Sequence, residues 1–183
     1  MINGLSDQSH PCQVMSDILT FEENNGNIEG KTISWIGDGN NNMSNSFIEA
    51  AVKFKFNLKI GCPKKYSPSG KILKWASKNK SKIFVTKDPR EAAKDADCIM
   101  TDKWVSMNDK VNKKAKKKSL KDYQVNKKLF KLAKTDCIFM HCLPVGRGEE
   151  VADDIIDGKK SVVWQQAYNR VHAQKSIINW CLN

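Results

Sequence analysis

The chain has 183 residues, 40% of them hydrophobic, which is enough for one domain with a buried core. Its formal net charge is +11, but only three of the 31 basic residues are arginine and the lysines cluster where a solvated surface is expected, which argues against specific nucleic-acid binding. No apolar run approaches the roughly 20 residues of a membrane span, and the N-terminus has no signal-peptide pattern, so we expect a cytoplasmic protein.

The first predicted helix runs from about residue 11 to 23, with Pro11 in its first turn. His10 and Gln13 are three residues apart, so they share a face at the positively polarised N-terminus of this helix. They either present donors to an anionic or carbonyl ligand, or simply form a helix start that contains a histidine.

Short apolar runs then predict six strands, at 32–36, 58–62, 82–86, 97–100, within 137–144 and at 161–164. Helices are predicted between them, at about 44–56, 68–79, from Asp88, 120–134, 149–157 and in a last segment that ends near Leu182. The lysine-rich residues 108–118 are predicted to form a mobile loop. This alternation is typical of a doubly wound, mostly parallel α/β sheet of about five to six strands with helices on both faces, as in Rossmann-like folds.

Polar residues follow four of these strands, at the sheet edge where open α/β sheets bind ligands. Gly37 to Asn42 lacks the G-x-G-x-x-G spacing, and its amides suit an amino-acid zwitterion better than a pyrophosphate, unless they form only a turn and a helix cap. Asp102 could hold a cationic amine and take up or orient its proton, or could cap the next segment. Met107, close behind it, could pack against an alkyl chain.

The six cysteines, at positions 12, 62, 98, 137, 142 and 181, form no C-x-x-C pair and match no zinc spacing, so we expect reduced thiols and no metal site. Cys142 differs because it stands at a strand end beside His141. It is either a nucleophile activated by that histidine or a ligand contact. Adjacent strand residues point to opposite faces, which favours contact. Arg170, expected at the start of the last helix, suits a phosphate or carboxylate.

Taken together, these motifs resemble the ornithine carbamoyltransferases over essentially the whole chain. The matching stretches are His10-Pro-Cys-Gln13, Gly37-Asp-Gly-Asn-Asn-Asn42, Asp102-Lys-Trp-Val-Ser-Met107, His141-Cys-Leu-Pro144, and Asn169-Arg170 with His172. The resemblance implies an enzyme that makes citrulline and phosphate from L-ornithine and carbamoyl phosphate, needs no metal or cofactor, and is usually a homotrimer.

The family's Ser-Thr-Arg-Thr loop, which binds carbamoyl phosphate in a first domain, is absent from this sequence. The chain therefore looks like the ornithine-binding domain, residues 31–183, preceded by an inter-domain helix and linker, residues 1–30, with the N-terminal domain missing. In such enzymes the last helix packs on that domain. With one wall of the cleft missing, we expect little or no turnover from this chain alone.

By the same resemblance, ornithine is expected on Asn42 or Asn41, Asp102, Ser106, Met107 and Cys142. The carbamoyl group is expected on His10 and Gln13, and carbamoyl phosphate on Cys142, Leu143 and Arg170. The catalytic residues would be Asp102, Cys142, Arg170 and His10. Two departures bear on loop closure, since Gly146 stands where the family usually has His and Asn108 where it usually has Gly.

Two alternatives stay open from the sequence: a carbamoyltransferase for another amine such as putrescine, and a stand-alone small-molecule binding module. Activity of the completed enzyme on each amine would separate the first from the leading hypothesis. A nucleic-acid-binding protein would instead lose affinity steeply with salt.

Overall fold

The structure is a computed structural model that describes residues 1–105 and 112–183. The strands are β1 Thr32–Ile36, β2 Asn57–Gly61, β3 Ile83–Thr86, β4 Cys98–Thr101 and β5 Ile138–His141. The α-helices are α1 Pro11–Asn25, α2 Asn42–Phe54, α3 Gly70–Lys78, α4 Pro89–Ala93, α5 Lys113–Leu120, α6 Lys127–Phe130, α7 Asp153–Ile156 and α8 Val163–Leu182. Two short 3-10 helices are η1 Lys64–Tyr66 and η2 Lys121–Tyr123.

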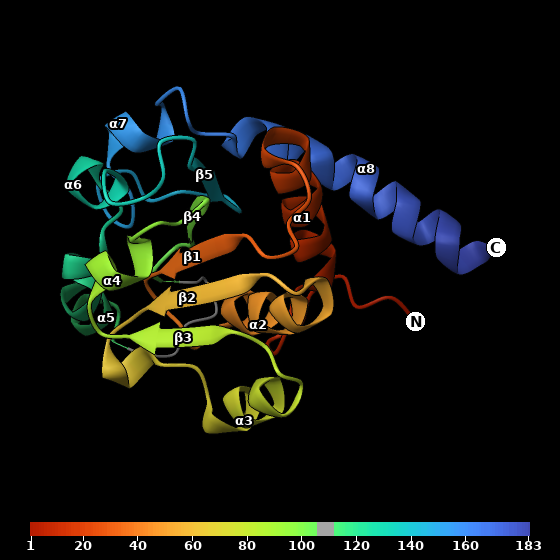
Figure 1. Cartoon of the computed structure of the whole chain (residues 1–183), viewed down its shortest axis with the longest axis horizontal. Helices are drawn as coiled ribbons and strands as arrows, with labels where there is room; N and C mark the ends of the chain where they lie inside the picture. The colour runs from red at the N-terminus through yellow and green to blue at the C-terminus, as the bar shows by residue number, and fades with distance from the viewer. Residues whose placement is uncertain (106–111) are drawn as a thin grey trace.

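The five strands form one parallel sheet in the order β3-β2-β1-β4-β5. Figure 1 shows the arrows of β1, β2 and β3 pointing the same way. The chain builds outward from β1 to β3 and then crosses back to place β4 on the other side of β1. The carboxyl ends of β1 and β4 therefore flank the topological switch point, where open α/β sheets bind ligands. The predicted fold class is confirmed.

Side chains of β1, β4 and β5 divide between two cores, one on either face of the sheet. Cys98 and Met100 of β4 pack with residues of α1, α2 and α3, whereas Ile99 packs with residues of α4 to α7. Met140 and Phe139 of β5 divide in the same way. Helices thus bury both faces of β4 and β5, which is why these strands appear in the sequence as continuous apolar runs.

The long helix α8 packs its first half against α1. Its buried residues are Val163, Gln166, Asn169 and Ala173, and the Asn169 amide donates to Thr20 Oγ1 of α1 at 2.9 Å. Beyond Ala173 the helix carries exposed apolar side chains, among them Trp180 at 82% exposure, and Figure 1 shows this end extending away from the sheet. Within the described residues, no helix is both long and apolar enough to cross a membrane.

The predicted sixth strand at 161–164 is wrong. Ser161 makes only an isolated bridge to Phe139 of β5, and α8 begins at Val163. Val163 is fully buried as part of the first turn of that helix. A run of three apolar residues is too short to distinguish a strand from a buried helix start, and tertiary packing decided it.

The segment between β4 and β5 also differs from expectation. The predicted loop at 108–118 contains most of α5, which Asn112 caps by accepting from the Ala115 amide. The predicted helix at 120–134 is broken, because Val125 is extended and pairs with Val151. The Val125 amide donates to Glu150 O, so this backbone is engaged outside a helix.

Candidate active site

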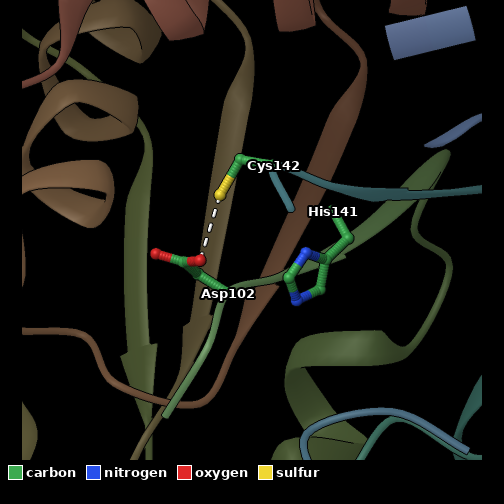
Figure 2. Close-up of side chains that lie close together, drawn as sticks. All are labelled: Asp102, His141 and Cys142. Carbon is green, nitrogen blue, oxygen red and sulfur yellow. Dashed lines mark hydrogen bonds between the residues drawn. The ribbon is translucent and has the colours of Figure 1, made fainter. Parts of the chain in front are cut away.

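Asp102 and Cys142 meet at the carboxyl edge of the sheet. β4 and β5 are neighbours in register, with Thr101 opposite His141, so the residues that follow them stand side by side. The Cys142 thiol donates to Asp102 Oδ1 at 3.0 Å, as Figure 2 shows. The same oxygen accepts from the Lys103 amide at 2.7 Å. Two strand ends therefore deliver a thiol and a carboxylate to one point, as the sequence predicts.

The surroundings of the Cys142 thiol disfavour its thiolate form. Burial, followed by the neighbouring carboxylate of Asp102, raises the pKa of the thiol well above its usual range. A thiol that stays protonated near neutral pH is a weak nucleophile but can still donate a hydrogen bond. Figure 2 draws a hydrogen bond from the Cys142 sulfur to Asp102 and none to the His141 ring, whose Nδ1 accepts from the Leu143 amide instead.

His141 shapes the loop that follows β5. Its Nδ1 accepts from the Leu143 amide at 2.9 Å, and its Nε2 lies 3.4 Å from Glu150 Oε1, with both side chains fully buried. Leu143 itself has φ of 53°, a left-handed conformation that a non-glycine residue seldom adopts. The buried imidazole thus supports the backbone turn that presents Leu143, one of the expected substrate contacts.

A metal ion does not fit this group well. Asp102, His141 and Cys142 each offer a ligand atom, and these atoms lie within 4.8 Å of one another. His141 Nδ1 already accepts from the Leu143 amide, however, and its Nε2 faces Glu150, although no hydrogen bond to that atom is formed among the described residues. A thiolate ligand would also require deprotonation of a thiol whose pKa is raised. The geometry favours a neutral thiol hydrogen-bonded to a carboxylate.

The loop after β1 brings Asn41 and Asn42 to the same edge of the sheet. Asn41 caps α2, because its side-chain oxygen accepts from the Ser44 amide at 2.8 Å, so the helix-cap interpretation is correct for this residue. That bond leaves the amide nitrogen of Asn41 as a separate donor. The Asn42 amide donates to Ser6 O at 3.0 Å. Gly39 is needed here, since a Cβ would lie 2.9 Å from the Tyr66 carbonyl oxygen.

A buried ion pair holds this loop against α5. Lys116 Nζ lies 2.6 Å from Asp38 Oδ2, and the two side chains are 8% and 5% exposed. The ammonium also lies 5.5 Å from the centre of the Tyr66 ring. Asp38 Oδ1 accepts from the Asn40 amide at 2.8 Å. The Asp38 carboxylate therefore holds both the turn at Asn40 and, through Lys116, helix α5.

His10, Gln13 and Arg170 come together where α1 meets α8. An Arg170 guanidinium nitrogen donates to Gln13 Oε1. Burial, and then the charge of Arg170, lowers the pKa of His10, against smaller opposite effects of the Gly4 backbone and Asp102. His10 is therefore neutral near pH 7. Arg170 is in the middle of α8 and not at a helix start, so that part of the prediction is wrong. It is positioned by the packing of α8 against α1.

Two polar atoms of the residues expected to contact carbamoyl phosphate have no hydrogen-bond partner in the described part of the chain. His10 Nδ1 and Arg170 Nε are both buried and have no hydrogen-bond partner among the residues that the structure describes. Buried polar atoms are nearly always satisfied, so a bound anion or carbonyl group would complete them. Gln13 differs, because its amide nitrogen donates to Asp17 and its amide oxygen accepts from Arg170.

The sequence reasoning missed Asp17 and Gln166, which are buried and hydrogen-bonded to each other at 2.7 Å. A signal was available, because Asp17 lies four residues after Gln13 and Gln166 four residues before Arg170. Each pair thus shares a helix face. Ser106 and Met107, also expected in the site, lie outside the described residues.

Two surface hollows lie elsewhere. One of about 650 Å³ is lined by residues of α4, η2 and α6, including Arg90 and Leu129. The other, of about 250 Å³, is an apolar groove between α1, α2 and α3 beside Trp75. Neither of these two hollows is lined by the expected site residues at the carboxyl ends of β4 and β5.

Comparison with known proteins points to the same family as the sequence motifs. The model of the aspartate/ornithine carbamoyltransferase, Asp/Orn binding domain, matches residues 29–181. A curated ornithine carbamoyltransferase from Rhodopseudomonas palustris is 53% identical over 182 residues, which covers 100% of this chain and 58% of that protein. One from Brucella abortus is 50% identical with the same coverage. The chain thus spans about three fifths of the length of these relatives.

Solved structures agree in fold. The ornithine carbamoyltransferase from Pyrococcus furiosus superimposes with a TM-score of 0.88 at 45% identity, covering 96% of this chain and 57% of that one. The anabolic enzyme from Campylobacter jejuni gives a TM-score of 0.90 at 36% identity, with 98% and 60% covered. In each case a similar fold extends over nearly the whole of this chain and over part of the longer protein.

Proposed function

This chain belongs to the aspartate/ornithine carbamoyltransferase family, and we propose that it is the amino-acid-binding half of an ornithine carbamoyltransferase. The completed enzyme would transfer the carbamoyl group of carbamoyl phosphate to the δ-amine of L-ornithine, giving citrulline and phosphate. The observation that carries this proposal is the hydrogen-bonded pair of Asp102 and Cys142 at the strand edge, beside Asn41 and Asn42.

That pair suits a primary amine. The δ-ammonium group of ornithine must lose a proton before its lone pair can attack the carbamoyl carbon. The Asp102 carboxylate would attract the cation and orient its proton, and the neutral Cys142 sulfur would contact the same nitrogen. Asn41 and Asn42 would bind the α-carboxylate and α-ammonium groups, because an amide both donates and accepts. Ser106 and Met107 stay predictions as further contacts.

The junction of α1 and α8 suits the second substrate. As the amine attacks, the carbamoyl oxygen gains negative charge and the bond to the phosphate oxygen breaks, so that phosphate leaves with the electron pair. Neutral His10 and the Arg170 guanidinium are donors that could stabilise the oxyanion and the leaving phosphate. Gln13 would act through Arg170, and Leu143 would contribute its backbone. No covalent intermediate is required.

Most of the rate would come from holding two substrates together in a cleft that excludes water. We propose that a carbamoyl phosphate-binding domain supplies the second wall, since the relatives are longer than this chain. The isolated chain should then bind ornithine with little or no turnover. The homotrimer and the cytoplasmic location expected from the resemblance stay predictions.

The test is an NMR titration of the ¹⁵N-labelled chain with L-ornithine, with putrescine and L-aspartate as controls. Ornithine alone should shift amides near Asn41, Asp102 and Cys142. Asp102→Asn should abolish the response, whereas Asp97→Asn, which changes a buried carboxylate at the amino end of β4, should preserve it. Equal shifts with putrescine would point to another amine, and a folded chain that responds to no ligand would contradict the proposal.

A further inference from the structure

Asp17 lies at the centre of a buried chain of hydrogen bonds. Its Oδ1 accepts from Gln13 Nε2 and from Gln166 Nε2, both at 2.7 Å. At the far ends, Gln13 Oε1 accepts from Arg170, and Gln166 Oε1 accepts from the His141 amide at 2.9 Å. Asp17, Gln13 and Gln166 are each at most 1% exposed. One carboxylate is thus connected to both halves of the candidate site.

The chemistry of the carboxylate sets the donor and acceptor of every hydrogen bond in this series. An ionised carboxylate can only accept hydrogen bonds, so each glutamine must turn its NH₂ group towards Asp17. Each glutamine carbonyl then faces outward, and both meet a donor there, Arg170 in one case and the His141 amide in the other. Flipping either amide would set donor against donor, which is costly in a buried place.

We propose that Asp17 is a positioning residue, which fixes the two glutamine amides and through them the Arg170 guanidinium and the backbone that leads into Cys142. The inference rests on the proposed function, because Arg170 and Cys142 matter only if they bind substrate. Asp17 reaches both through a glutamine. Its role is to hold those groups in one geometry before substrate arrives.

The surroundings of Asp17 make this role measurable. Burial raises the pKa of Asp17 to about 7, although the two glutamine hydrogen bonds act to lower it. The charged and titratable groups that interact with it are Arg170 of α8, Asp102 after β4, Cys98 of β4 and Cys142 after β5. Proton uptake removes the negative charge that both amides face, so both should respond at one pH.

The test is a pH titration of the ¹⁵N-labelled 183-residue chain by NMR, without ligand. The side-chain NH₂ signals of Gln13 and Gln166 and the backbone amide of His141 should shift with one common midpoint near pH 7. Asp17→Asn should abolish that transition in all three signals. Thr20→Val is the matched control, because it removes another buried hydrogen bond between α1 and α8 and should leave the transition intact.

Separate midpoints for the two glutamines in the unsubstituted chain, or no transition near pH 7, would overturn the proposal. So would a transition that persists in Asp17→Asn or disappears in Thr20→Val. If Asp17→Asn does not fold, the titration of the unsubstituted chain decides alone. Since no ornithine or carbamoyl phosphate is present, failure of this test is distinct from failure of the proposed function.

Discussion

Replacing Lys116 by methionine removes one partner of the buried pair with Asp38 and leaves the carboxylate without its cation. A buried charge that loses its partner costs about 3–5 kcal/mol of unfolding free energy. Both side chains are less than 10% exposed, so water cannot replace the ammonium, and the contact with the Tyr66 ring is lost too. For a chain of this length we expect a Tm lower by roughly 6–20 °C.

Chemical denaturation followed by far-UV circular dichroism measures this effect. Lys117→Met is the matched control, because Lys117 is the next residue of α5 and forms an exposed ion pair with Glu149. The two side chains are 45% and 36% exposed. Such a surface pair contributes at most about 1 kcal/mol. Adding Asp38→Asn to Lys116→Met should recover part of the loss, since an Asn oxygen can still accept from the Asn40 amide.

Equal stability of Lys116→Met and Lys117→Met would refute the reasoning. It would mean that the carboxylate finds another cation or reaches water when Lys116 is gone. A double variant less stable than Lys116→Met alone would refute it as well, because neutralising an unpaired buried carboxylate should relieve strain and not add to it.

Three further predictions concern the site and the core. Asp102→Asn should lower the pKa of the Cys142 thiol and speed its alkylation at neutral pH, because the Asp102 charge is one cause of the raised pKa; an unchanged rate would contradict this. The NMR titration midpoint of His10 should lie below its usual value of about 6.5, and it should rise in Arg170→Met, because the charge of Arg170 disfavours the imidazolium. An unchanged midpoint in Arg170→Met would contradict an effect of Arg170 on His10. Ile99→Ala, in a fully buried position of β4, should cost about 2–5 kcal/mol in denaturant unfolding, and a cost below about 1 kcal/mol would show that the core collapses around it.

The sheet and the strand-end residues could be predicted from the sequence for a physical reason. Strands buried on both faces must be apolar throughout, so β4 and β5 stand out between polar segments. Parallel strands end at the same edge, so the apolar runs alone place Asp102 and Cys142 at one edge of the sheet. Their 3.0 Å contact then follows from the pairing of β4 with β5.

Other features depend on tertiary contacts that no local pattern contains. Val163 and Trp164 have strand propensity, yet the turn after the bridge at Ser161 directs them into α8. Lys116 looks like any other lysine of a solvated helix until Asp38 is placed beside it. Asp17 and Gln166 occupy ordinary polar positions on two helices 149 residues apart, and only their packing makes them the centre of a network.

The helix α8 does two things along one rigid axis. Its first half carries Gln166 and Arg170, which belong to the candidate site, and its second half ends in the exposed side chains of Trp180 and Leu182. From Arg170 to Leu182 the axis rises about 18 Å. A partner surface that covered this apolar end would therefore lie on the same helix as Arg170, about 18 Å along its axis.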